Sequence, residues 1–134
     1  MSVMLFGYSL VHTAYIVEFE QEPLSIPAVE ALLFGWYDLF GAGISWIANF
    51  FLIYSYSILF KNTRLALAGA SVAVSFALSF LFFDEVMINR YGVLCPVLQY
   101  GPGFWLWVGS ALAITFGSFA ILMIGKYGTL ARPE

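Results

Sequence analysis

Four uncharged, apolar runs constrain the fold of this chain more than any other feature. They cover residues 1–17, 44–60, 65–83 and 103–124. At about 1.5 Å per helical residue, the last two reach roughly 28 and 33 Å, which suffices for a hydrocarbon core of about 30 Å. The first two reach about 25 Å and need a thinner bilayer around them. The pattern predicts an all-α membrane protein, a single transmembrane domain over 1–134 with four helices at about 2–17, 44–60, 65–83 and 103–125.

The composition points in the same direction. Hydrophobic residues make up 62% of the chain and charged residues 10%, against about 45–50% and about 25% in soluble domains. A soluble domain of this length cannot bury so much apolar surface, because small domains leave a large share exposed. A signal peptide is the alternative for residues 1–17, but they contain no basic start and no small-residue cleavage site.

The basic residues indicate the orientation. Lys61 and Arg64 lie between the second and third runs, and Lys126 and Arg132 follow the fourth. The positive-inside rule places both segments in the cytoplasm. The remaining loops then face outward, and they hold Arg90 together with seven acidic residues, Glu18, Glu20, Glu22, Glu30, Asp38, Asp84 and Glu85. We therefore expect a multi-pass membrane protein with both termini in the cytoplasm.

Two outer segments carry patterns of their own. After Pro27, apolar residues recur at the spacing of one helical face, at Val29, Leu32, Leu33, Trp36 and Phe40. This spacing predicts an interfacial helix at about 27–37, lying on the outer membrane surface, with Gly41 to Gly43 as a flexible corner after it. A re-entrant turn or an extension of the second helix is the alternative. In the loop 84–102, residues 86–88 and 93–95 are apolar and are expected to pair as a small hairpin.

Small and aromatic residues indicate contacts. On the third predicted helix Ala66, Ala70, Ala73 and Ala77 share a face, and on the fourth Gly109, Ala113 and Gly117 repeat at the same interval. Small residues at this spacing let helix backbones approach closely, so we expect these two faces to pack together, with a homo-oligomeric contact as the alternative. The expected outer interface is formed by Glu30, Trp36, Asp38, Trp105 and Trp107, since tryptophan collects at membrane interfaces.

Three polar side chains fall at similar depths in three predicted helices. His12, Asn49 and Ser79 each lie four or five residues from the outer end of a helix. Because an unpaired polar group in hydrocarbon is costly, we expect them to meet in one polar layer. The layer is either structural hydrogen bonding or a site for a ligand or proton. One histidine without carboxylate or cysteine neighbours is a poor metal site.

The sequence carries no catalytic or cofactor signature. It has a single histidine, its carboxylates all fall in loops, and it has no glycine-rich phosphate loop. The single cysteine, Cys95, excludes an internal disulfide and a cysteine-based metal centre. A basic footprint for nucleic acid is also missing. We therefore expect no enzyme activity, no cofactor, no metal and no nucleic-acid partner.

Four segments carry a resemblance to a known class of protein. They are Trp46-Ile-Ala-Asn49, the basic turn Lys61-Asn-Thr-Arg64, the segment from Phe82 to Ile88, and Tyr100-Gly-Pro-Gly-Phe-Trp-Leu-Trp107. Over about residues 43–124 the chain resembles small, largely uncharacterised multi-pass inner-membrane proteins of Gram-negative bacteria. In topology alone it is similar to four-pass immunity proteins against pore-forming toxins.

The function expected from these patterns is that of a non-enzymatic integral membrane interaction protein. It would act as an accessory subunit of a membrane complex or as an immunity-type protein, with the lipid bilayer and a protein partner as its contacts. The acidic outer loops suit a basic partner, because clustered charge steers association. The alternative is a small oligomeric transporter or channel that uses the polar layer, although no charged residue lies inside a predicted span.

Overall fold

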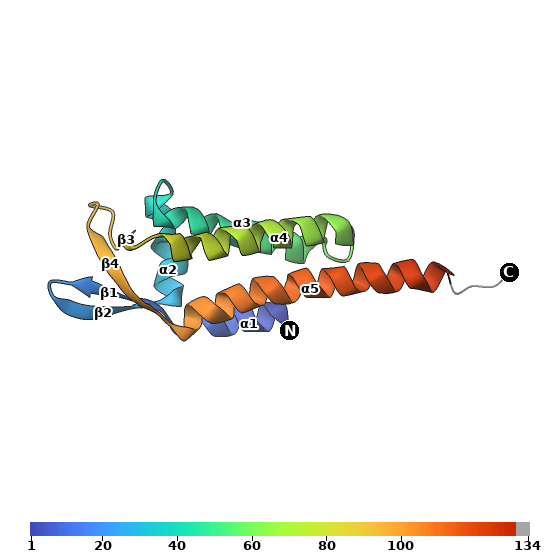
Figure 1. Ribbon diagram of the computed structural model, residues 1–134, viewed down its shortest axis with the longest axis horizontal. Helices are drawn as coiled ribbons and strands as arrows, with labels where there is room; N and C mark the ends of the chain where they lie inside the picture. The colour runs from blue at the N-terminus through green and yellow to red at the C-terminus, as the bar shows by residue number, and fades with distance from the viewer. Residues whose placement is uncertain (131–134) are drawn as a thin grey trace.

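The computed structural model describes residues 1–130, and side-chain surroundings as far as residue 126. Helices α1, α3, α4 and α5 lie roughly along one long axis, and α2 runs across it (Figure 1). A small sheet lies at one end, and the α3–α4 turn and the end of α5 lie at the other. The elements in chain order are α1 (Ser2–Ser9), β1 (Thr13–Phe19), β2 (Glu22–Pro27), α2 (Ala28–Phe34), η1 (Gly35–Asp38), η2 (Ala42–Ile47), α3 (Ala48–Ile58), α4 (Thr63–Ser79), η3 (Phe80–Phe82), β3 (Glu85–Met87), β4 (Leu94–Tyr100) and α5 (Pro102–Leu130).

The prediction of an all-α bundle with four transmembrane helices is wrong. The chain forms a four-stranded antiparallel sheet in the order β2-β1-β4-β3 beside its helices. Within residues 1–130, two helical stretches are long and apolar enough to cross a membrane, Thr63–Phe82 and Pro102–Lys126. A third candidate span is added if Ala28–Asp38 and Ala42–Ile58, which meet at a bend of 115°, count as one broken span.

The first apolar run divides into a helix and a strand. Helix α1 has 8 residues, or about 12 Å, too short for a bilayer of about 30 Å. From Thr13 the chain is extended because β1 has a partner on each side, β2 along one edge and β4 along the other. Tyr15 and Val17 are buried at alternate positions, the period of a strand with one face in the core. Long-range pairing therefore overrides a composition that suits a helix equally well.

The β1–β2 hairpin turns at Glu20 and Gln21, which have φ values of 52° and 69°. Positive φ at both central residues is the geometry of a type I′ turn, for which Asn-Gly and Asp-Gly are the usual residues. A Glu-Gln pair gives no such signal, so the hairpin was missed. The β3–β4 hairpin was predicted and is confirmed, since Val86 lies opposite Cys95 and Met87 opposite Leu94.

Two glycines join the sheet to helix α5. The Gly101 N–H donates to the Ala14 carbonyl at 2.7 Å. A Cβ added at Gly101 would lie 2.2 Å from the Thr13 carbonyl oxygen, and one at Gly103 would lie 2.8 Å from the same atom. Glycine at positions 101 and 103 thus lets β1 pass directly over the start of α5. A side chain at either position would clash with the backbone of β1 at this spacing.

The helix core is built on the small-residue face of α4. Ala66, Ala70, Ala73 and Ala77 are fully buried, and α4 packs against both α3 and α5. Helix α5 presents a different face from the predicted one. Its buried side chains include Phe104, Val108, Ala111, Ile114 and Ser118.

The predicted stripe on α5 lies on the far side of that helix. A Cβ added at Gly109 or Gly117 would meet nothing within 4 Å, and Ala113, which shares their face at the i, i+4 interval, is only half-buried. The physical reason is size, because the alanines of α4 already permit close approach and α5 fills the space with larger side chains. The tightest helix contact is instead at Gly69, where a Cβ would lie 2.6 Å from Ser55 Oγ on α3.

Candidate functional site

The two ends of the molecule carry opposite charges. The described acidic residues lie in the sheet, its turns, α2 and η1, with Glu18, Glu20 and Glu22 all exposed around the β1–β2 hairpin. Lys61 and Arg64 lie at the opposite end, around the α3–α4 turn (Figure 1). We refer to the sheet with its turns, residues 13–27 and 84–100, as the cap. The cap also exposes apolar side chains, with Tyr91, Leu94 and Leu98 more than half accessible.

The five residues expected at the outer interface divide into two groups. Glu30, Trp36 and Trp105 are exposed. Asp38 and Trp107 instead turn towards the interior, because each has a hydrogen-bond partner there. Asp38 Oδ2 accepts from the Ala42 N–H at 3.1 Å, across the bend between η1 and η2. Trp107 Nε1 donates to Asn49 Oδ1 at 3.0 Å, linking α5 to α3.

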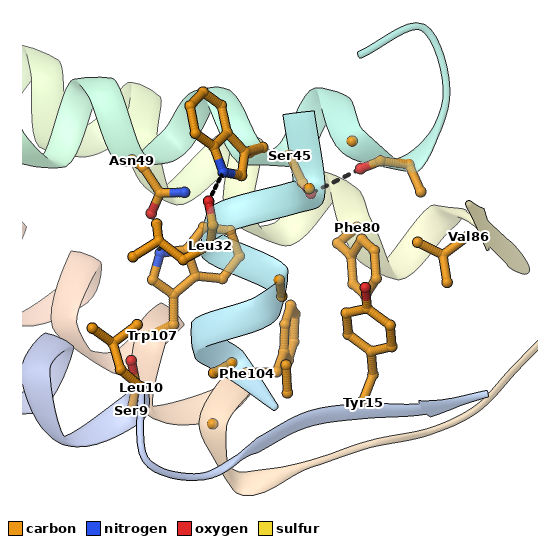
Figure 2. A pocket seen from close by; sticks show the side chains of 18 of the residues that line it. Ser9, Leu10, Tyr15, Leu32, Ser45, Asn49, Phe80, Val86, Phe104 and Trp107 are labelled. Carbon is orange, nitrogen blue, oxygen red and sulfur yellow. Dashed lines mark hydrogen bonds between the residues drawn. The ribbon is translucent and has the colours of Figure 1, made fainter. Parts of the chain in front are cut away.

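A cavity of about 80 Å³ lies where these interior groups meet, between the cap and the helices. Its walls come from α1, β1, α2, η1, η2, α3, η3, β3 and α5, so it exists because the chain bends sharply between η1 and η2. Figure 2 shows the apolar wall formed by Leu10, Leu32, Phe80, Phe104 and Trp107. Trp46 closes one side, since its Nε1 donates to the Leu32 carbonyl at 2.6 Å and ties η2 to α2.

Two polar groups of this cavity have hydrogen-bonding capacity left. Asn49 uses its carbonyl oxygen for Trp107, and its amide N–H groups make no hydrogen bond within residues 1–130. The Tyr15 hydroxyl also makes none in that part of the chain. Asn49 is 6% exposed and Tyr15 8%, but their donor atoms stay accessible, since Ser118 Oγ is the one closed-off side-chain N or O atom without a partner among the described residues. By contrast, Ser45 Oγ is satisfied by the Ala42 carbonyl at 2.8 Å.

Burial also sets the ionisation of the phenols and the thiol in the cap. Desolvation, with a smaller contribution from Glu30, raises the pKa of Tyr15 to about 12, so its hydroxyl stays protonated and able to donate. Burial, with a smaller contribution from Glu85, raises the pKa of the Cys95 thiol. An inert, protonated thiol results, because the thiolate is the reactive form.

The three side chains of the predicted polar layer bond to separate partners. His12 Nδ1 lies 3.0 Å from the Tyr8 carbonyl oxygen. The centroids of the His12 ring and the exposed Tyr8 ring are 4.5 Å apart. Ser79 Oγ donates to the Phe76 carbonyl at 2.6 Å within its own helix. Asn49 lines the cavity, whereas His12 and Ser79 do not. The expected meeting of the three side chains assumed that residues 2–17 form one continuous helix. Helix α1 ends at Ser9, so His12 does not lie where a continuous helix would place it.

Sequence reasoning missed Tyr15 and Trp46 as cavity residues. Tyr15 had been placed on a helix, and nothing in the pattern around Trp46 distinguishes an interior tryptophan from an interfacial one. Within residues 1–130, no group of three or more His, Cys, Asp or Glu side chains is arranged to hold a metal ion. Within residues 1–130, the residues of the site can therefore interact with a ligand through hydrogen bonds and apolar contacts.

Comparison with protein-family models, with curated proteins and with solved structures finds no match to this chain. The resemblance to Gram-negative inner-membrane proteins and to immunity proteins thus stays a prediction. Function has to be argued from the charge distribution of the cap and from the cavity beneath it.

Proposed function

We propose that this chain is a non-enzymatic integral membrane protein that acts by binding a protein partner with its acidic cap, as an accessory subunit or an immunity-type protein. In this proposal α4, α5 and the bent pair of helices cross the inner membrane of a bacterium. The positive-inside rule then puts Lys61, Arg64 and the C-terminus in the cytoplasm and the cap outside. The proposal does not include the expected membrane crossing by residues 2–17, because α1 is too short to span a bilayer.

The observation that supports the proposal most directly is that the acidic residues and the exposed apolar residues share one folded unit. The cap is an ordered sheet, which carries Glu18, Glu20 and Glu22 around the β1–β2 hairpin and exposed Leu94 and Leu98 on β4. Interfaces combine apolar contact with complementary charge, and fixed charges steer a basic partner.

The edges of the sheet favour recognition through its faces and turns. Strand β2 has prolines at positions 23 and 27, and β3 has three residues. Proline and short length both blunt an edge strand, so strand addition by a partner is disfavoured. A transporter role has less support, because it required His12, Asn49 and Ser79 to meet.

Co-purification in mild detergent from membranes of the native host tests the proposal. The double variant Glu18→Gln, Glu20→Gln removes two charges from the cap, and Lys61→Gln, Arg64→Gln removes two from the opposite end as a matched control. We expect a basic partner to be recovered with the wild type and the control, and to be lost from the cap variant and at high salt. Equal recovery with both variants, or no partner with the wild type after chemical cross-linking, would contradict the proposal.

A further inference from the structure

We propose that the cavity between the cap and the helices binds the carbonyl end of a neutral, mainly apolar molecule that enters from the lipid. This site is separate from the acidic surface of the cap, and its occupant is a small molecule. Two donors without a protein partner, carried by mostly buried side chains in an apolar wall, support the proposal.

The two donors are the amide of Asn49 and the hydroxyl of Tyr15. Both side chains are more than nine-tenths buried, and neither donor has a hydrogen-bond partner within residues 1–130. Burying a polar group without a hydrogen bond costs free energy, so a donor in such a place favours an incoming acceptor. In Figure 2 Asn49 and Tyr15 lie at different ends of the cavity, so a single carbonyl oxygen engages one of them. We assign it to the Tyr15 hydroxyl, because the Asn49 side chain already bonds Trp107, whereas the Tyr15 hydroxyl makes no hydrogen bond within residues 1–130.

The charges around the cavity select against an anionic ligand. Asp38 is the one charged side chain among the described residues that line the cavity, and no basic side chain lines it. A carboxylate or phosphate would lose its hydration and gain no cation in return. A carbonyl oxygen is neutral and can accept from one donor at a time, and the Tyr15 hydroxyl stays protonated, so it is available to donate.

The size of the cavity limits the occupant. A volume of about 80 Å³ is about half that of an engineered cavity of about 150 Å³ that holds benzene. It therefore admits the end of a narrow chain and not a whole lipid. Phe80, Phe104 and Trp107 supply apolar and aromatic contacts for the body of such a chain.

The wall formed by α2 points to the lipid as the route of entry. Ala31 and Leu32 face the cavity, while Val29, Leu33 and Phe34 on the same short helix are exposed. A seven-residue helix with apolar side chains on both sides suits a boundary between lipid and cavity. The carbonyl can come from two sources, the ester group of a bilayer lipid or a free membrane-soluble ketone.

Photolabelling of the full chain in nanodiscs tests the site. The probe is heptan-2-one with a diazirine at the far end of its chain, and the matched control probe has the same chain without the carbonyl. We expect saturable labelling of cavity residues by the ketone, and weaker labelling by the control probe. Labelling at equal strength by both probes, or none at the cavity, would overturn the proposal.

Two tyrosine variants separate hydrogen bonding from structure. Tyr15→Phe removes a hydroxyl that has no protein partner, so the fold should persist while the ketone binds roughly tenfold more weakly. Tyr54→Phe changes an exposed tyrosine away from the cavity and should leave labelling unchanged. An unchanged affinity in Tyr15→Phe would mean a cavity filled with water only, which overturns the proposal.

The composition of the nanodisc distinguishes the two sources of the carbonyl. Discs of ether-linked phospholipid contain no ester carbonyl, whereas discs of ester-linked phospholipid contain two in each lipid. Weaker ketone labelling in the ester-linked discs identifies the lipid ester as a competing occupant. Equal labelling in both discs identifies a free ketone as the ligand class, and both results support the site. A failure here leaves the cap unaffected, since Glu18 and Glu20 do not line the cavity.

Discussion

The contrast between Ala73 and Gly117 gives the most decisive test of the helix packing. Ala73 is fully buried on α4, so Leu at this position adds three carbon atoms where no space exists. Overpacking of this kind lowers the free energy of unfolding by about 1–3 kcal/mol. Gly117 lies on the open side of α5, where an added Cβ meets nothing within 4 Å. Leu there replaces a poor helix former and should raise the free energy of unfolding by up to about 1 kcal/mol.

The two variants introduce the same side chain, so their comparison removes the effect of added hydrophobicity. Reversible unfolding in mixed micelles, with an increasing fraction of denaturing detergent and helicity followed by circular dichroism, measures both free energies. The expected difference between Ala73→Leu and Gly117→Leu is about 1–4 kcal/mol, with opposite signs relative to the wild type.

Equal destabilisation by the two substitutions would refute this reasoning. It would mean that Gly117 packs against another helix, either within one molecule as the sequence suggested or in a second copy. A concentration-dependent loss of stability for Gly117→Leu would identify the second copy.

Three further outcomes are expected. Gly69→Ala should lower the free energy of unfolding by about 1–3 kcal/mol, since its Cβ would lie 2.6 Å from Ser55 Oγ, whereas Gly109→Ala in the same unfolding assay should not. In the proposed topology residue 62 is cytoplasmic, so a membrane-impermeant maleimide should label Asn62→Cys only after the cells are permeabilised. The same reagent should label Glu20→Cys in intact cells. The reverse labelling pattern would mean that the topology is inverted. Because the pKa of Tyr15 rises from 10.0 unfolded to about 12 in the folded protein, the unfolded state loses its proton first. Stability should therefore fall as pH rises between about 10 and 12, measured by denaturation beside phenolate absorbance, and Tyr15→Phe should remove that fall.

Local signals were sufficient for the elements whose stabilising contacts lie close in sequence. Helix α4 begins where Asn62 caps it, with Oδ1 accepting from the Leu65 N–H at 3.2 Å, and the charged turn before it marks that boundary in the sequence. The short helix after Pro27 follows the periodicity of its apolar residues. The β3–β4 hairpin follows from two apolar triplets around Gly92, which takes a positive φ of 83°.

The strand β1 could not be predicted, because its conformation depends on residues far along the chain. Residues 10–17 contain no Asp, Glu, Lys or Arg, and their composition suits a membrane helix as well as a strand. Tyr15 pairs with Tyr100, 85 positions away, and that pairing decides between the two. The type I′ turn at Glu20 and Gln21 contains neither Gly nor Asn, so the sequence carries no local signal for the β1–β2 hairpin.

The sequence predicts one residue of the cavity, Asn49, but not the contacts that the residue makes. Asn49 was singled out as a costly polar residue in an apolar run, and it does line the cavity. Its partner Trp107 was assigned to the membrane interface, because sequence cannot tell which way an indole N–H points. The cavity depends on a bend that Gly43 permits, where a Cβ would lie 2.4 Å from the Gly35 carbonyl oxygen. A tight backbone crossing of this kind leaves no periodic pattern.

The order of strands in the cap has a consequence for how the protein is made. Strand β1 finds β2 at once, but its other edge pairs with β4, which begins at Leu94. At a synthesis rate of roughly 5–20 residues per second, about 4–15 s separate the completion of Phe19 from the arrival of Leu94. Throughout that interval an apolar strand edge is open to pairing with other chains. The cap can close only after the long helical stretch Thr63–Phe82 has been synthesised, and any chain that stops before β4 carries the exposed edge permanently.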